Sequence, residues 1–203
     1  TGSMTWTTYQ GNTNVAYLLD PRYSKLASYF SGAKNIFKCP SDHFLSAAQR
    51  RAGFTERVRS ISGNIRIGDD SNAWDTKAFP RFTAKASGLT DPGPSDTWIY
   101  MDEHPDSIND VGNFTYEPFA RRWVDVPANY HNGAAGIAFA DGHSEVHKWK
   151  GNLGGAPFVI LPAGTGNLGA IRAYAKRDAD ALWWALRTQR KSGITEAAIR
   201  GTF

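Results

Sequence analysis

The chain has 203 residues, of which 41% are hydrophobic and 21% charged, and a formal net charge of +4. This length suits one domain with a substantial core, residues 5–203, and residues 1–4 (Thr-Gly-Ser-Met) are interpreted as a cloning scar. The composition excludes a disordered, coiled-coil or collagen-like chain. The single cysteine, Cys39, excludes an internal disulfide framework and a multi-cysteine zinc site. The charge is too small to indicate a specific nucleic-acid partner, and no apolar stretch approaches the roughly 20 residues that span a bilayer.

The sequence pattern of the N-terminal part predicts short helices and strands. Residues 21–30 are predicted to form a helix, because Asp20 suits the N-cap and Pro21 suits the first helical position. Residues 35–39 are predicted to be extended, and residues 54–67 to form one or two strands.

The sequence pattern of the second half predicts a buried strand, a helix and long loops. Residues 97–101 form a short apolar run that is typical of a buried strand. Residues 102–113 are polar and acidic, and residues 151–169 are rich in glycine and proline, so both are predicted to be loops. Residues 178–189 are predicted to be helical, with acidic residues at the start and Arg187 at the end, as the helix dipole favours. The predicted fold class is α+β, with a small antiparallel sheet, long loops and few helices.

Residues 136–149 carry the clearest local signal, because Asp-Gly at 141–142 separates two alternating runs. This pattern predicts a β-hairpin with a two-residue type I′ turn, which would pair Ile137 with Val146 on the core face. The opposite face would then carry His143, Glu145 and His147. His143 and Glu145, with one residue from elsewhere, are candidate zinc or copper ligands; a half-exposed polar strand face is the alternative.

The acidic loop contains a second candidate metal site. Its hard oxygen donors are of the kind that calcium prefers, although the spacing is not that of an EF-hand, and a solvated loop with Asx turns is the alternative. The candidate calcium ligands are Asp102, Glu103, Asp106, Asn109 and Asp110.

Seven tryptophans are many for one small core. One or two exposed rings would be able to stack on sugars, and Trp74 and Trp123 are the candidates. Core packing or loop anchoring is the alternative for each ring.

Several pieces of the chain together resemble a known family. His131 is followed by nine residues and then by Asp141-Gly142-His143, which looks like the H-X9-DG signature of the prepilin-type, processing-associated, pseudopilin-like bacterial proteins. Three further pieces fit the same family in order: Phe-Lys-Cys-Pro-Ser-Asp at 37–42, Arg-Ser-Ile-Ser-Gly-Asn at 59–64, and Tyr-Met-Asp-Glu-His-Pro-Asp at 100–106. The resemblance covers roughly residues 34 to 150 and leaves the role of the later part open.

The resemblance implies a pilin-like globular head and a structural role as a filament subunit, without catalytic residues. In that family a cleaved leader and a hydrophobic N-terminal helix precede the head, and the helix anchors the subunit in the inner membrane. The sequence does not contain this helix, so we expect the chain to be the soluble head of an anchored protein, located in the periplasm or at the cell surface. Its expected partners are other pseudopilin subunits and the secretion machinery of type II secretion-like systems. Related major pseudopilins bind calcium, so the resemblance also implies that the acidic loop is a candidate calcium site.

Within the signature, His131 is interpreted as a structural residue that hydrogen-bonds the Asp141 turn or nearby backbone, and Asp141 and Gly142 as turn-forming residues. Two other functions stay open. One is an extracytoplasmic module that binds polysaccharide or another polymer. The other is a metal-dependent hydrolase that uses His131, Asp141, His143 or Glu145.

Overall fold

The structure is a computed structural model and describes residues 5–68, 83–109, 113–114, 116–117, 122–123, 125–155, 177–190 and 192–202. Two predicted site residues, Trp74 and Asp110, lie outside this part of the chain, as does most of the predicted loop after Gly155. The strands are β1 (Ile61–Asn64), β2 (Trp98–Asp102), β3 (Asn113–Phe114), β4 (Tyr116–Glu117), β5 (Arg122–Trp123), β6 (Ala134–Phe139) and β7 (Ser144–Lys148). The helices are α1 (Ala16–Leu19), α2 (Ala47–Arg51), α4 (Ala179–Leu186) and α5 (Glu196–Thr202), with short 3₁₀ turns between them.

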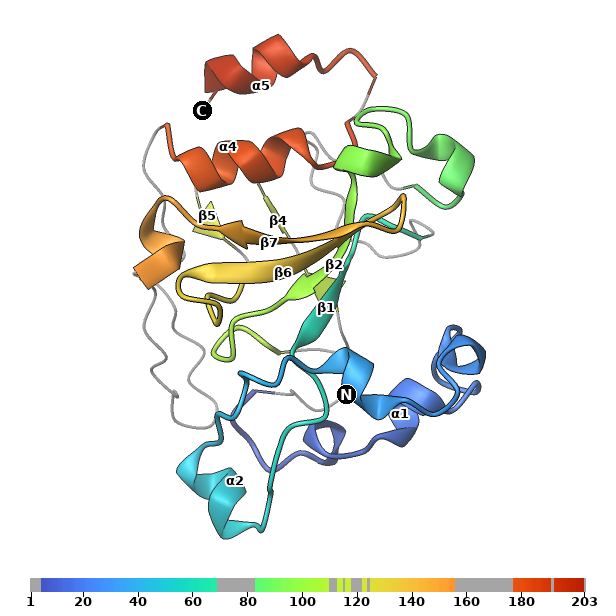
Figure 1. The fold of residues 1–203 in the computed structure, drawn as a ribbon, viewed down its shortest axis with the longest axis vertical. Helices are drawn as coiled ribbons and strands as arrows, with labels where there is room; N and C mark the ends of the chain where they lie inside the picture. The colour runs from blue at the N-terminus through green and yellow to red at the C-terminus, as the bar shows by residue number, and fades with distance from the viewer. Residues whose placement is uncertain are drawn as a thin grey trace.

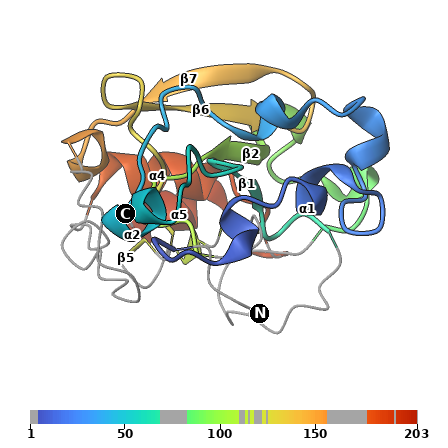
Figure 2. The same cartoon turned by 90° about the horizontal axis from the view of Figure 1, so that it is seen from below.

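The main sheet has the strand order β3-β1-β2-β6-β7. Neighbouring strands from β1 to β7 are antiparallel, whereas β3 runs parallel to β1. In Figure 2, β7, β6, β2 and β1 follow one another across the molecule. The prediction of an α+β fold with a small antiparallel sheet, few helices and long loops is confirmed. None of the helices in the described part of the chain has the length and apolar character of a membrane span.

Helix α4 covers one face of the sheet, and α5 lies outside α4 (Figure 1). Asp178 begins α4 as its N-cap, because its side chain accepts hydrogen bonds from the N–H groups of Asp180 and Ala181. Trp184 is fully buried at the centre of this contact. Its ring centroid is 4.5 Å from that of Trp98 and 6.1 Å from that of Trp123. The predicted helix at 178–189 is therefore confirmed, and it supplies the main core contact of the sheet.

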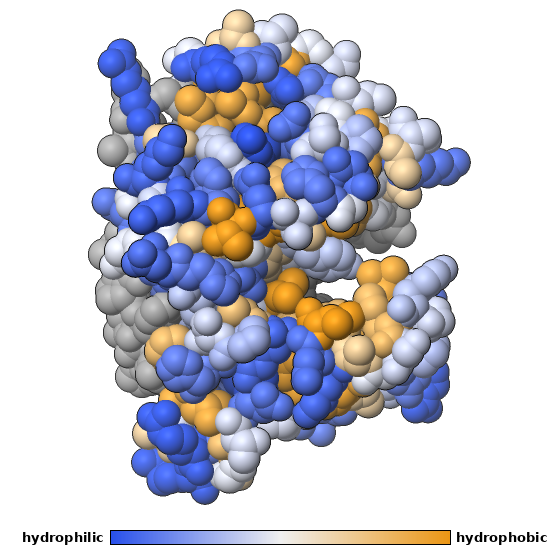
Figure 3. Space-filling view, viewed as in Figure 1, coloured by the Kyte–Doolittle hydropathy of each residue, from blue (hydrophilic) through white to orange (hydrophobic). Residues whose placement is uncertain are grey.

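The opposite face of the sheet looks toward the N-terminal segment that contains α1 and α2, as both ribbon views show (Figures 1 and 2). On the sheet itself lies an open hollow of about 340 Å³, lined by Tyr100, Asp102, Gly136, Val146 and other residues of β1, β2, β6 and β7. Figure 3 shows hydrophobic side chains at the surface in this middle region of the molecule. This side of the sheet is therefore only partly covered.

The hairpin forms, but its register differs from the prediction by one residue. Ile137 pairs with Glu145, and Gly136 pairs with Val146. The loop has three residues because Phe139 N–H donates to the His143 carbonyl and Gly142, at φ 97°, closes the turn. Because side chains alternate along a strand, a shift of one residue moves every side chain of β7 to the other face. Val146 is accordingly 65% exposed instead of buried.

Two local predictions for the N-terminal part are wrong. Residues 21–30 contain turns and a 3₁₀ turn at Ala27–Tyr29 instead of a helix, although the Asp20 carboxylate accepts from the Arg22 N–H as an N-cap residue does. Residues 35–39 are not extended throughout, since a 3₁₀ turn occupies Lys34–Phe37. The strand predicted at 97–101 is confirmed as β2.

Candidate functional site

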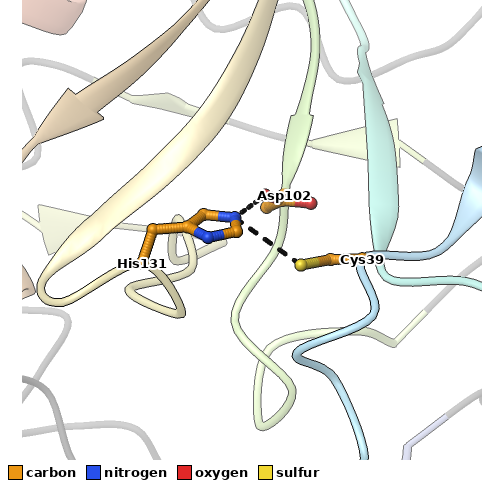
Figure 4. A group of neighbouring side chains, drawn as sticks. All are labelled: Cys39, Asp102 and His131. Atoms are coloured by element: carbon orange, nitrogen blue, oxygen red, sulfur yellow. Dashed lines mark hydrogen bonds and ion pairs between the residues drawn. The ribbon is translucent and has the colours of Figure 1, made fainter.

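Three side chains from distant parts of the chain meet on the partly covered side of the sheet. Cys39 follows the 3₁₀ turn Lys34–Phe37, Asp102 is the last residue of β2, and His131 lies in the turn before β6. The Nε2 atom of His131 is 3.6 Å from the Cys39 Sγ and 3.4 Å from the Asp102 Oδ2 (Figure 4). In the described part of the chain, these residues are the one group of three whose ligand atoms lie within 4.8 Å of one another.

The backbone holds each of the three residues in place. Cys39 N–H donates to the Ser60 hydroxyl at 2.7 Å, which fixes the cysteine against the segment that enters β1. Asp102 Oδ2 accepts a hydrogen bond from Gly136 N–H at 3.0 Å, so β6 orients the carboxylate. His131 N–H donates to the Ala134 carbonyl at 3.1 Å in a tight turn.

A glycine beside Asp102 avoids a close contact with its carboxylate. A Cβ atom at Gly136 would lie 3.0 Å from the Asp102 Oδ2, closer than ordinary packing permits. The missing side chain therefore leaves room for the carboxylate to lie over β6 and accept from its backbone.

Burial governs the protonation of the two acids in this group. It raises the pKa of the Cys39 thiol, while the N–H groups of Ser41 and Asp42 and the Ser41 hydroxyl act in the opposite direction by hydrogen-bonding the thiolate. Burial also raises the pKa of Asp102, against the lowering effect of Gly136 N–H and of His131. The net effect of burial favours the protonated form of both groups more than water would.

The sequence patterns do not predict this group. Cys39 is buried, at 6% exposure, and no local pattern indicates its contact with His131. The available signal was that each of the three residues lies in a different piece of the family resemblance. Local pattern cannot show that these pieces meet, because the contacts span 92 residues between Cys39 and His131.

The predicted contact between His131 and the Asp141 turn is wrong. His131 precedes β6 and Asp141 follows it, so the six residues of β6 separate the two by about 20 Å. Asp141 instead accepts from His143 N–H and contacts its Nδ1 at 2.6 Å, both in the exposed hairpin loop. Gly142 has the turn role that was predicted for it.

The hairpin histidines do not form a metal-binding group with Glu145 among the described residues. His143 stacks on Phe139, with ring centroids 4.3 Å apart, and His147 stacks on Trp183 at 3.9 Å. Because of the register shift, β7 directs the His147 ring toward the α4 side of the sheet.

The candidate calcium ligands are placed in different surroundings. Asp102 belongs to the group with Cys39 and His131, Glu103 accepts from the Ser62 hydroxyl, and Asp106 Oδ1 accepts from the Trp6 indole N–H at 2.7 Å. All three are buried, whereas Asn109 is exposed. Each of these three carboxylates is thus bound by its own protein donor, and the alternative of a solvated loop is also wrong, because residues 102–108 are buried.

Trp123 does not offer a ring for stacking on a sugar, because it is 1% exposed and packs edge-on against Trp184.

Comparison with known proteins gave no match: no family model, curated protein or solved structure matches the chain.

Proposed function

We propose that this chain is the head of a type II secretion-like, pilin-like pseudopilin, a structural filament subunit that lies outside the cytoplasm. In the full-length protein, a hydrophobic helix before the head anchors the subunit in the inner membrane. The head then contacts neighbouring pseudopilin subunits and the secretion machinery. In this proposal the chain has no catalytic residues.

The observation that carries the proposal is the spatial continuity of the pieces that resemble the family. Residues 59–64 and 130–143 contain β1 and β6, and residues 100–106 include the end of β2; the three strands are neighbours in one sheet. The fourth piece, residues 37–42, contributes Cys39, whose Sγ is 3.6 Å from the His131 Nε2. The resemblance therefore extends over one physical unit instead of over separate short matches.

The experiment has two steps. The coding sequence upstream of Met4 should contain a leader and an apolar segment of about 20 residues, the length that spans a bilayer. The full-length protein is then expressed in a bacterium with type II secretion machinery, and the cells are fractionated and treated with an amine cross-linker. We expect the protein in the inner membrane, with cross-linked ladders of copies and an accessible head in spheroplasts.

The matched control is the 203-residue chain exported by a cleavable signal peptide. It should stay in the soluble periplasmic fraction and form no ladder. An upstream sequence without the apolar segment, or a full-length protein in the cytoplasm, would overturn the proposal.

A further inference from the structure

We infer that Cys39, Asp102 and His131 form a binding site for one zinc-like divalent transition-metal ion, with one coordination position left for water or an external ligand. This inference does not depend on the proposed filament function. It concerns a mixed thiolate, carboxylate and imidazole site, not the oxygen site that the acidic loop predicts.

The two separations that involve His131 Nε2 match those around a tetrahedral ion, and all three ligand atoms lie within 4.8 Å of one another. Zinc bonds of about 2.3 Å to sulfur and about 2.0–2.1 Å to nitrogen and oxygen, at a tetrahedral angle, place sulfur roughly 3.6 Å from nitrogen and nitrogen roughly 3.4 Å from oxygen. The structure has 3.6 Å between Cys39 Sγ and His131 Nε2, and 3.4 Å between that nitrogen and Asp102 Oδ2. The positions of sulfur and oxygen around His131 Nε2 therefore suit an ion bound among the three atoms.

The direction of the contacts distinguishes a metal site from a nucleophilic triad. In a cysteine-histidine-aspartate triad, the thiol and the carboxylate contact different ring nitrogens, because the histidine relays a proton between them. Here both groups face the same atom, His131 Nε2 (Figure 4). A single N–H can point well at only one of them, whereas an ion among the three atoms is bound by all of them.

The ligand types select the metal. A thiolate is a soft ligand that favours zinc over calcium and magnesium, which bind oxygen ligands. The Cys39 thiolate and the Asp102 carboxylate together carry two negative charges, which a divalent cation neutralises in this buried place. With His131 they make three protein ligands, the number that is typical of zinc sites with an open position.

The surroundings support the ligands as outer-shell groups do in metal proteins. The Ser60 hydroxyl accepts from Cys39 N–H and fixes its backbone, and Gly136 N–H orients the Asp102 carboxylate. His131 is 37% exposed in its side chain, and Asp102 lines the hollow under the sheet. A fourth ligand can therefore reach the ion from the solvent side.

The test uses the 203-residue chain without an affinity tag, freed of metal by a chelator, and titrated with zinc chloride by calorimetry. We expect one zinc per chain, and cobalt should give a thiolate-to-metal charge-transfer band. Cys39→Ser and His131→Asn should each weaken zinc binding by more than roughly 100-fold, beyond the loss of about 10–100-fold that an outer-shell change causes. Cys39→Ser should also abolish the cobalt band.

Two further variants separate the site from general effects. His143→Asn removes an exposed histidine whose Nδ1 lies 2.6 Å from the Asp141 Oδ1 and which has no thiolate beside it, and it should leave zinc affinity unchanged. Gly136→Ala removes no ligand but crowds Asp102, and should weaken binding by about 10-fold. If Cys39→Ser does not fold by circular dichroism, the more exposed His131→Asn decides the outcome.

Three results would overturn the inference: no zinc bound at micromolar concentration, equal affinity in wild type and both ligand variants, or a cobalt complex without the charge-transfer band. Displacement of zinc by millimolar calcium would equally contradict a thiolate site. None of these results bears on membrane anchoring, so the two proposals fail independently.

Discussion

On the α4 side of the sheet the buried side chains are aromatic and aliphatic, whereas around the loop after β2 many of them are charged. We call the first region the tryptophan core (Trp98, Trp123, Trp149 and Trp184) and the second the buried charge cluster (Asp42, Arg57, Arg59, Glu103 and Asp106). Every member of both regions is at most 7% exposed. The two regions are equally buried but are stabilised by different kinds of interaction.

The buried charge cluster depends on specific partners. Arg57 donates to the Pro105 carbonyl at 3.0 Å, lies over the Trp6 ring at 4.3 Å and pairs with Asp42 at 3.3 Å. These contacts attach the N-terminal segment to the loop after β2. A buried charge is tolerated only when such partners are present, whereas an apolar core requires only close packing. The buried charge cluster therefore determines how the N-terminal segment packs on the loop after β2, whereas the tryptophan core stabilises the fold by burying apolar side chains.

The largest expected effect is in the tryptophan core. Trp184→Ala should lower the free energy of unfolding by about 3–5 kcal/mol, because it leaves a cavity that Trp98 and Trp123 line. Urea denaturation followed by circular dichroism measures the loss. A loss below about 1 kcal/mol would show that α4 contributes little to the core.

Next comes a conservative change in the buried charge cluster. Ser62 Oγ accepts from the Arg59 guanidinium at 2.6 Å and donates to the Glu103 carboxylate. Ser62→Ala should cost about 2 kcal/mol, since it leaves buried charged groups with one partner fewer. Ser144→Ala, on an exposed strand position, is the control and should cost little. Equal effects of the two changes in urea denaturation would contradict the specific role of the cluster.

A smaller, pH-dependent effect is expected at the edge of the tryptophan core. Burial lowers the pKa of His147, and Arg187 and Lys150 lower it further, while Glu145 opposes them. The unfolded chain therefore binds a proton on His147 more readily than the folded chain does. Neutral His147 therefore does not reduce the free energy of unfolding at a pH above its ordinary pKa of 6.5. As the pH falls below 6.5 toward the lower pKa of the folded state, the unfolded chain gains the proton first and the folded state loses stability.

Midpoints of urea denaturation at about pH 7.5 and about pH 5.5 test this effect. The decrease in the wild-type midpoint on acidification should be smaller in His147→Gln, which cannot gain the proton. An identical decrease in both proteins would assign the pH dependence to other groups.

The smallest effect tests the register of the hairpin. Val146→Thr should change stability by less than about 0.5 kcal/mol, because this side chain is 65% exposed. The matched change Ile137→Val, at a position with 2% exposure, should cost about 1 kcal/mol. A larger loss at Val146 than at Ile137 would support the two-residue turn and the opposite register.

The elements that depend on local pattern were predictable. The apolar run of β2, the turn residues between β6 and β7, and the capped helix α4 all follow from neighbouring residues. The hairpin register was not predictable, because Asp-Gly is compatible with both a two-residue turn and a three-residue loop with glycine at the positive-φ position. Packing of His143 on Phe139 and of His147 on Trp183 accompanies the longer loop.

The sequence by itself determined the fold class, the main helix of the core and the pieces that resemble the pseudopilin-like family. Only the tertiary structure decided that the Cys39 sulfur and the Asp102 carboxylate both lie beside the Nε2 atom of His131, and that the acidic loop is buried beside arginine side chains. The physical reason is that hydrophobic periodicity and turn residues determine structure over a few neighbouring residues. The grouping of these three side chains depends instead on the order and register of the strands. The order β1-β2-β6 and the glycine at 136 bring the three side chains together.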